Sequence, residues 1–139
     1  MTRPIRARID LAALRHNHAI ARRHAGSSRI WSVIKANGYG HGALRMARGL
    51  ADVADGFALI ELDTAIALRE QGIAQPMLMM EGFYRGDELS LFAQHGLTPV
   101  IHRLDQAALL AESQLMMPVY LKLNTGMNRL GFSQKDFPE

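Results

Sequence analysis

Short apolar runs alternate with amphipathic stretches along this 139-residue chain. Apolar runs of strand length are RIWSVIKA (29–36), GFALI (56–60), PMLMME (76–81), LTPVI (97–101) and PVYLKLN (118–124). Helical spacing of apolar residues predicts helices over 42–52, 61–72, 85–96 and 103–114. A further helix is predicted before the first strand, with Asp10 as its N-cap and Gly26 at its end.

This alternation predicts an α/β fold with a parallel sheet whose outer face is covered by helices. The regular step of about twenty residues between strands favours a (β/α)8 TIM-barrel type, with a doubly wound sheet as the alternative. A closed barrel takes roughly 200 residues or more, so we expect only about the first five β/α units here. The chain is expected to be a piece of a longer protein rather than a small open sheet.

Composition narrows the class of protein. Apolar residues make up 48% and charged residues 21%, and no apolar stretch reaches the length of a membrane span. The N-terminus lacks the apolar core of a signal peptide, and the absence of cysteine excludes disulfides and thiolate metal sites. We therefore expect a cytoplasmic protein without a membrane partner or a metal. The basic residues behind the net charge of +3 are scattered and have no aromatic platform beside them, which argues against nucleic acid.

The lysines are few. Thirteen of the sixteen basic residues are arginine, and the lysines are Lys35, Lys122 and Lys135. A retained lysine suits chemistry that arginine cannot perform, although codon bias would give the same ratio. Lys35 and Lys122 come near the carboxyl ends of the first and fifth predicted strands, where a parallel α/β fold gathers its functional groups.

Lys35 opens the stretch KANGYGHG, in which glycines at 38, 40 and 42 permit unusual backbone angles and close approach of a ligand. A lysine partly withdrawn from water has a lowered pKa, which a Schiff-base lysine requires. The helix that begins near Gly42 is suited to an anion such as a phosphate, and Tyr39 is placed to offer it a hydroxyl. The alternative is a surface lysine before a glycine turn, and His41 by itself is interpreted as a turn or surface histidine.

The stretch YLKLNTGMNRLGF (120–132) has a similar design. Gly126 and Gly131 bend the chain, and Arg129 is presented from a loop, where its planar fork suits a carboxylate. Lys122 and Arg129 in one site would repel each other unless an anion lay between them.

These two stretches, VIKANGYGHG (33–42) and LKLNTGMNRLGF (121–132), closely resemble the alanine racemase family. Residues 54–73 and 76–83 between them also resemble the family's N-terminal half. The resemblance implies pyridoxal 5'-phosphate enzymes with an eight-stranded barrel and a C-terminal β domain. It further implies homodimers that interconvert L-alanine and D-alanine, a peptidoglycan precursor. Residues 1–139 then form the N-terminal part of the barrel domain, and the rest of the barrel and the β domain are absent.

The resemblance also assigns roles by position. Lys35 matches the lysine that holds pyridoxal phosphate as a Schiff base and acts as the base on the D-alanine side. Tyr39 matches the tyrosine that hydrogen-bonds the cofactor phosphate. Arg129 matches the arginine that faces the substrate carboxylate and the cofactor's phenolic oxygen. Lys122 matches a lysine that is carbamylated in some members, and a carbamate would neutralise the Lys122–Arg129 pair.

In this family the second base is a tyrosine of the partner subunit's C-terminal domain, which this sequence does not contain. We therefore expect residues 1–139 alone to lack racemase activity. A broad-specificity amino-acid racemase is the nearest alternative. A non-catalytic pyridoxal-phosphate barrel protein is another, although Arg129 argues against it because a carrier has no substrate carboxylate to hold. An inert fragment is the third.

Overall fold

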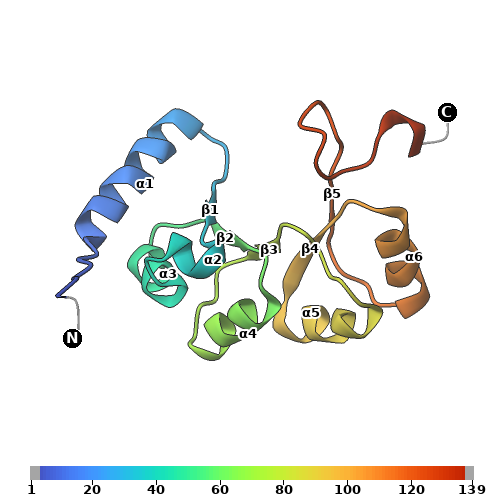
Figure 1. Ribbon diagram of the computed structural model, residues 1–139, viewed down its shortest axis with the longest axis horizontal. Coiled ribbons are helices and arrows are strands. Elements are labelled where there is room, and N and C mark those ends of the chain that lie inside the picture. The colour runs from blue at the N-terminus through green and yellow to red at the C-terminus, as the bar shows by residue number, and fades with distance from the viewer. Residues whose placement is uncertain (1–3, 137–139) are drawn as a thin grey trace.

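Five short strands form one parallel sheet in the computed structural model, which describes residues 4–136 (Figure 1). They are β1 (Trp31–Val33), β2 (Gly56–Leu59), β3 (Met77–Met79), β4 (Leu97–Ile101) and β5 (Tyr120–Leu121). Each strand pairs in parallel with the next along the chain. A doubly wound sheet reverses its strand order at a switch point, so the sequential order favours the predicted barrel type over that alternative.

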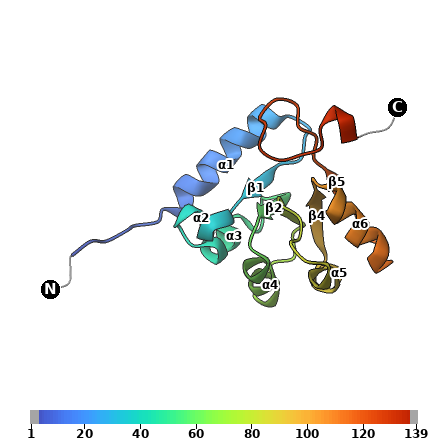
Figure 2. The same ribbon diagram turned by 45° about the vertical axis from the view of Figure 1, so that its right-hand side comes forward.

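Helices connect the strands, and Figure 2 shows α3 to α6 arranged in an arc outside the sheet. The helices are α1 (Leu11–Ala25), α2 (Lys35–Tyr39), α3 (Ala43–Leu50), α4 (Leu62–Glu70), α5 (Leu89–His95) and α6 (Leu104–Ser113). Two short 3-10 turns, η1 (Gly86–Glu88) and η2 (Gln134–Asp136), complete the elements of residues 4–136. No helix in this range is long and apolar enough to cross a membrane.

Every predicted strand and helix is confirmed within a few residues, except around Lys35. Asp10 caps α1 as predicted, since its Oδ1 accepts hydrogen bonds from the amides of Ala12 (2.9 Å) and Ala13 (3.1 Å). The first strand is shorter than the predicted 29–36, because Lys35 already begins the segment labelled α2.

The two faces of the sheet carry different clusters. The helix-covered face holds the main core, in which these strand side chains are essentially fully buried: Phe57, Leu59, Met77, Met79 and Ile101. The inner face carries a smaller cluster of Ala58, Leu78 and Val100, against which Trp31 packs. Strand side chains alternate between faces, and both faces are buried at β2, β3 and β4, which explains why these strands are continuous apolar runs.

The sheet curves toward its inner face. Trp31 of β1 and Tyr120 of β5 make an edge-to-face contact, with ring centroids 6.2 Å apart and planes at 79°. Adjacent strands lie about 4.8 Å apart, so four strand spacings in a flat sheet would separate these strands by roughly 19 Å. Contact between residues of the two outermost strands therefore shows the curvature of a barrel wall.

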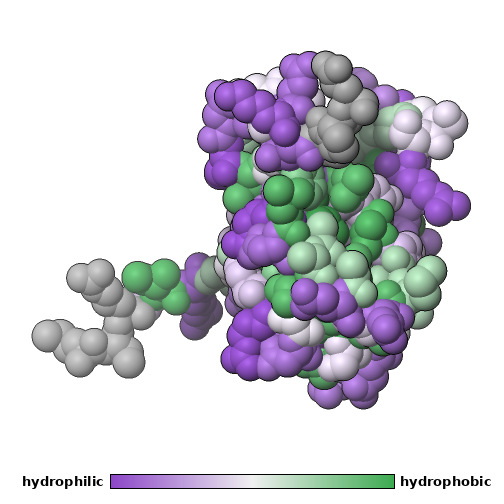
Figure 3. Space-filling model, turned by 90° about the vertical axis from the view of Figure 1, so that its right-hand side faces the viewer, coloured by the Kyte–Doolittle hydropathy of each residue, from purple (hydrophilic) through white to green (hydrophobic). Residues whose placement is uncertain are grey.

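Apolar side chains gather at the β5 edge of the molecule, over α6 and the segment that leads into β5 (Figure 3). They line a hollow of about 350 Å³ that includes Leu110, Leu115, Met116, Val119 and Leu121. Met116 is 97% exposed and Leu121 is 58% exposed. Within residues 4–136, β5 pairs on one side only, so the sheet and its apolar covering are both open at this edge.

Candidate functional site

Lys35 lies at the carboxyl end of β1, where the chain leaves the sheet. The preceding amide, Ile34 N, still donates to Ala58 O of β2 (2.9 Å), so sheet pairing continues up to the residue before the lysine. Ile34 is 3% exposed, whereas Lys35 is half-buried. The lysine therefore stands at the rim between the packed sheet and solvent, as the sequence predicted.

The chain then makes a left-handed turn, Ala36–Tyr39, in place of an ordinary helix. Backbone angles are φ 50° and ψ 50° at Ala36, φ 53° and ψ 45° at Asn37, and φ 63° and ψ 39° at Gly38. Tyr39 follows with φ 53°. For a residue other than glycine this conformation costs about 1–2 kcal/mol. Three such residues within four positions require strong support from their surroundings.

Backbone and side-chain hydrogen bonds supply that support. Within the segment, Gly38 N donates to Ile34 O (2.9 Å) and Gly40 N donates to Ala36 O (3.1 Å). The side chain of Asn37 accepts from Ala43 N at 2.9 Å, and the His41 ring nitrogen Nδ1 lies 2.9 Å from Gly38 O. His41 is thus a turn histidine, as predicted.

A carboxylate on the neighbouring strand connection holds the first amide of the turn. Oε1 of Glu61 accepts from Ala36 N at 2.8 Å. Neither Glu61 nor Asn37 was a predicted site residue, because nothing in their sequence spacing relates them to the lysine. Asn37 also occupies the first amide of α3, so the helix N-terminus predicted as an anion site is partly satisfied from within the chain.

Lys122 lies at the end of β5, on the opposite edge of the sheet from Lys35. Its Nζ donates to Met80 O at 2.8 Å. Burial lowers the pKa of Lys122, and the positive charges of Arg129 and Lys35 add to that effect, whereas the carboxylate of Glu81 opposes it. Lys35 and Arg129 therefore both lie within electrostatic range of Lys122.

Arg129 comes from a loop ordered by an asparagine. Oδ1 of Asn124 accepts from the amides of Gly126 (3.2 Å) and Asn128 (3.0 Å). The loop closes where Phe132 N donates to Lys122 O and Asn124 N donates to Phe132 O, each at 2.8 Å. A small hollow of about 150 Å³ lies in this loop, with Lys122 and Arg129 in its wall.

Glu81 is a carboxylate whose negative charge acts on Lys122. The hydroxyl of Tyr84 donates to Glu81 Oε2 at 2.6 Å, and this bond, with burial, raises the pKa of Tyr84 to about 12. The side chain of Gln106 donates to Glu81 O (3.0 Å), which anchors the backbone at this point. Lys35, Lys122 and Arg129 together bring three positive charges to this end of the sheet, so the site suits an anionic ligand.

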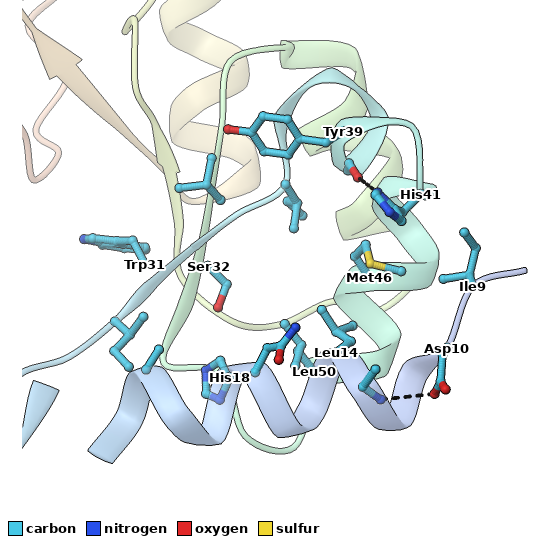
Figure 4. Close-up of a pocket in the computed structure, with 17 residues that line it drawn as sticks. Ile9, Asp10, Leu14, His18, Trp31, Ser32, Tyr39, His41, Met46 and Leu50 are labelled. Carbon is cyan, nitrogen blue, oxygen red and sulfur yellow. Dashed lines mark hydrogen bonds between the residues drawn. The ribbon is translucent and has the colours of Figure 1, made fainter. Parts of the chain in front are cut away.

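We call Lys35, Lys122 and Arg129 the cationic group. Lys35 and Arg129 both act electrostatically on Lys122, although Lys35 follows one outermost strand and Lys122 the other. Tyr39, the fourth predicted residue, is 60% exposed and lines a different hollow of about 530 Å³ between α1 and β1 (Figure 4). That hollow is mainly apolar, with Leu14, Met46 and Leu50 in its wall. It is larger than the hollow beside Arg129, but the charged chemistry lies with the cationic group.

Comparison with known proteins agrees with this geometry. The family described as "Alanine racemase, N-terminal domain" matches residues 9–139. An alanine racemase of Nitrosospira multiformis is 53% identical over 140 residues, which cover 99% of this chain and 39% of the relative. A catabolic alanine racemase of Klebsiella aerogenes is 51% identical, over 95% of this chain and 37% of the relative. The chain thus spans less than two fifths of these relatives.

Solved structures give the same result for the fold. The biosynthetic alanine racemase of Pseudomonas aeruginosa superposes with a TM-score of 0.87 and 39% identity, over 91% of this chain and 36% of that one. The alanine racemase of Corynebacterium glutamicum superposes with a TM-score of 0.83 and 27% identity, over 92% and 38%. The predicted barrel-type fold is confirmed.

Proposed function

This chain belongs to the alanine racemase family, and we propose that it forms the N-terminal barrel portion of a racemase that interconverts L-alanine and D-alanine with pyridoxal 5'-phosphate. The observation that supports the proposal is that Lys35 and Arg129 both lie within electrostatic range of Lys122, with the two lysines at the carboxyl ends of β1 and β5.

The residues present fit this cofactor. Pyridoxal phosphate has an aldehyde, which a primary amine holds, and a dianionic phosphate, which positive charge and hydroxyl groups hold. Lys35 offers a half-buried amine at a strand tip. The cationic group carries the positive charge that an anionic phosphate needs. Tyr39 has an exposed side chain four residues from Lys35 and offers its hydroxyl to the phosphate.

Each residue then has a separate task. Lys35 holds the cofactor through Nζ and later carries a proton at that same atom on the D-alanine side. Arg129 binds the substrate carboxylate through its fork of N–H groups. Lys122 donates to Met80 O and lies beside Arg129, and a carbamate on Lys122 would replace its positive charge with a negative one that balances Arg129. When bound, the cofactor acidifies the α-hydrogen of the amino acid.

Racemisation needs a proton donor and acceptor on each face of the substrate. Lys35 serves one face. We propose that the other face is served by a tyrosine from the C-terminal domain of a partner subunit, in a homodimer of the longer protein to which residues 1–139 contribute their part of the barrel.

The test is a mapped reduction. Purified protein carrying this sequence is incubated with pyridoxal phosphate, reduced with borohydride and digested. We expect a pyridoxyl group on Lys35 and its loss in Lys35→Arg, which keeps the charge but not the amine chemistry. Labelling of Lys122 or Lys135 in place of Lys35 would overturn the assignment. A panel of amino acids assayed with the longer protein should show alanine as the fastest substrate, and equal rates across larger side chains would indicate a broad-specificity racemase.

A further inference from the structure

Glu61 follows β2 and Lys35 follows β1, so both lie where the chain leaves the carboxyl ends of neighbouring strands. Glu61 occupies the N-cap position of α4, but its side chain makes no capping hydrogen bond there. Instead its Oε1 reaches the adjacent connection and accepts from Ala36 N at 2.8 Å. The side chain of Glu61 therefore stabilises the turn after Lys35 rather than the first turn of α4.

The amide that Glu61 holds belongs to the same peptide group as the carbonyl of Lys35. Because a peptide group is planar, a fixed Ala36 N–H fixes the plane on the carboxyl side of Lys35. The plane on its amino side is held by Ile34 O, which accepts from Gly38 N at 2.9 Å. With both planes held, the Cα–Cβ direction of Lys35 is set, and with it the origin of the long side chain.

The second oxygen of the same carboxyl group supports this role. Oε2 of Glu61 is buried and has no hydrogen-bond partner among residues 4–136. A carboxylate that only solvated the surface would turn both oxygens to water, since burying a charged oxygen is unfavourable. The carboxyl group is therefore held in the protein by the bond to Ala36.

We propose that Glu61 is the positioning residue for Lys35, clamping the start of the left-handed turn so that the lysine amine faces Lys122 and Arg129. This inference rests on the proposed function, because it concerns the amine that would hold the cofactor. Glu61 acts through Ala36 and need not touch the cofactor or substrate itself.

The experiment compares rates of modification at single lysines. Wild-type protein and the variants Glu61→Ala, Glu61→Gln and Asp63→Ala are treated with pyridoxal phosphate and borohydride, and each lysine is quantified by peptide mapping. We expect Glu61→Ala to slow labelling of Lys35 about tenfold, a loss typical of a misplaced reacting group, while Lys122 and Lys135 keep their rates. Glu61→Gln retains an oxygen acceptor and should stay within about threefold of wild type.

Asp63→Ala is the matched control, because it removes a carboxylate from the same hollow as Glu61 with no hydrogen bond to the turn. Equal labelling of Lys35 in Glu61→Ala and Asp63→Ala would overturn the proposal, as would an equal slowing at Lys35 and Lys122, which would indicate general loosening. If wild-type protein gave no adduct at Lys35, the proposed function would fail instead.

A second measurement does not depend on variants that fold. Amide exchange at Ala36 in the wild-type protein without cofactor reports whether its N–H is held. We expect this amide to exchange at least about tenfold more slowly than an open loop amide. Exchange at the rate of an unstructured peptide would contradict the clamp.

Discussion

Gly56 lies directly against the indole of Trp31, on the strand beside it. A Cβ atom at position 56 would come within 2.8 Å of Trp31 Cε3 and 3.0 Å of Pro76 O. The missing side chain at Gly56 is therefore what lets the indole lie across the inner face and reach Tyr120 on the far strand. This packing and the curvature of the sheet occur together, because Trp31 contacts Tyr120 across the inner face.

Adding one methyl group at this position should disturb the inner face. We expect Gly56→Ala to lower the free energy of unfolding by about 1–3 kcal/mol, because the core would be overpacked. Denaturant titration followed by tryptophan fluorescence measures this directly, since Trp31 is the only tryptophan. Pairing the change with Trp31→Phe should recover part of the loss. A Gly56→Ala protein as stable as wild type would show that the indole has room to move.

The loop that carries Arg129 offers two glycines for comparison. At Gly131, with φ 118°, a Cβ would come within 2.8 Å of Asn124 N, whereas at Gly126, with φ 144°, nothing lies within 4 Å. Gly131→Ala should therefore destabilise the protein by about 1–3 kcal/mol more than Gly126→Ala, because both changes strain the backbone but only the first also clashes. Parallel thermal and denaturant melts measure the difference, and equal losses would remove the steric explanation.

Tyr84 should ionise at a higher pH than an ordinary tyrosine. Its bond to Glu81 raises its pKa to about 12, so absorbance titration near 295 nm should show one of the three tyrosines ionising about two pH units above the usual 10. Tyr84→Phe should remove that step, and Glu81→Gln should move it toward 10. Because the folded pKa lies above the unfolded one, this bond's contribution to stability is complete below about pH 10 and is lost as pH rises through 12. A normal titration of Tyr84 would contradict the contact.

Lys122 should be more reactive than a surface lysine. Since burial and its cationic neighbours lower its pKa, a larger share of its amine is unprotonated at pH 8. Competitive acetylation with mapping should label Lys122 several-fold faster than Lys135 once access is normalised in unfolded protein. Arg129→Gln should slow that labelling and Glu81→Gln should quicken it, because the two charges act on the lysine in opposite directions. The same change of rate in both variants would show that charge is not the cause.

The sequence predicted the architecture because its signals are local. Apolar runs, caps such as Asp10 and end glycines such as Gly26 each depend on a few neighbouring residues, and the structure has an element for each of them. The sequence could also predict one rim for Lys35, Lys122 and Arg129, because a barrel places the carboxyl ends of its strands at the same rim. Whether Lys122 and Arg129 lay near Lys35 depended on the curvature of the sheet, which a linear pattern does not contain.

The turn after Lys35 lay beyond such reasoning. Glycines at 38 and 40 predicted unusual backbone angles. Ala36, Asn37 and Tyr39 also adopt the left-handed conformation, which their residue types do not favour in sequence. Two hydrogen bonds support these residues. The Asn37 side chain accepts from Ala43 N, and Glu61, which follows β2, accepts from Ala36 N. Contacts of this kind are set by tertiary structure and become visible only when the strands are in register.

The left-handed turn also has a stereochemical consequence. Residues 36–39 follow the mirror image of an ordinary helical path, which is the conformation that D-amino acids prefer. Glycine is the genetically encoded residue that tolerates this path most readily, so Ala36→Gly is the ordinary substitution that would relieve the strain. A D-alanine placed there by chemical synthesis would have the chirality of the backbone it joins, and the lysine beside it would be held by a conformation free of strain.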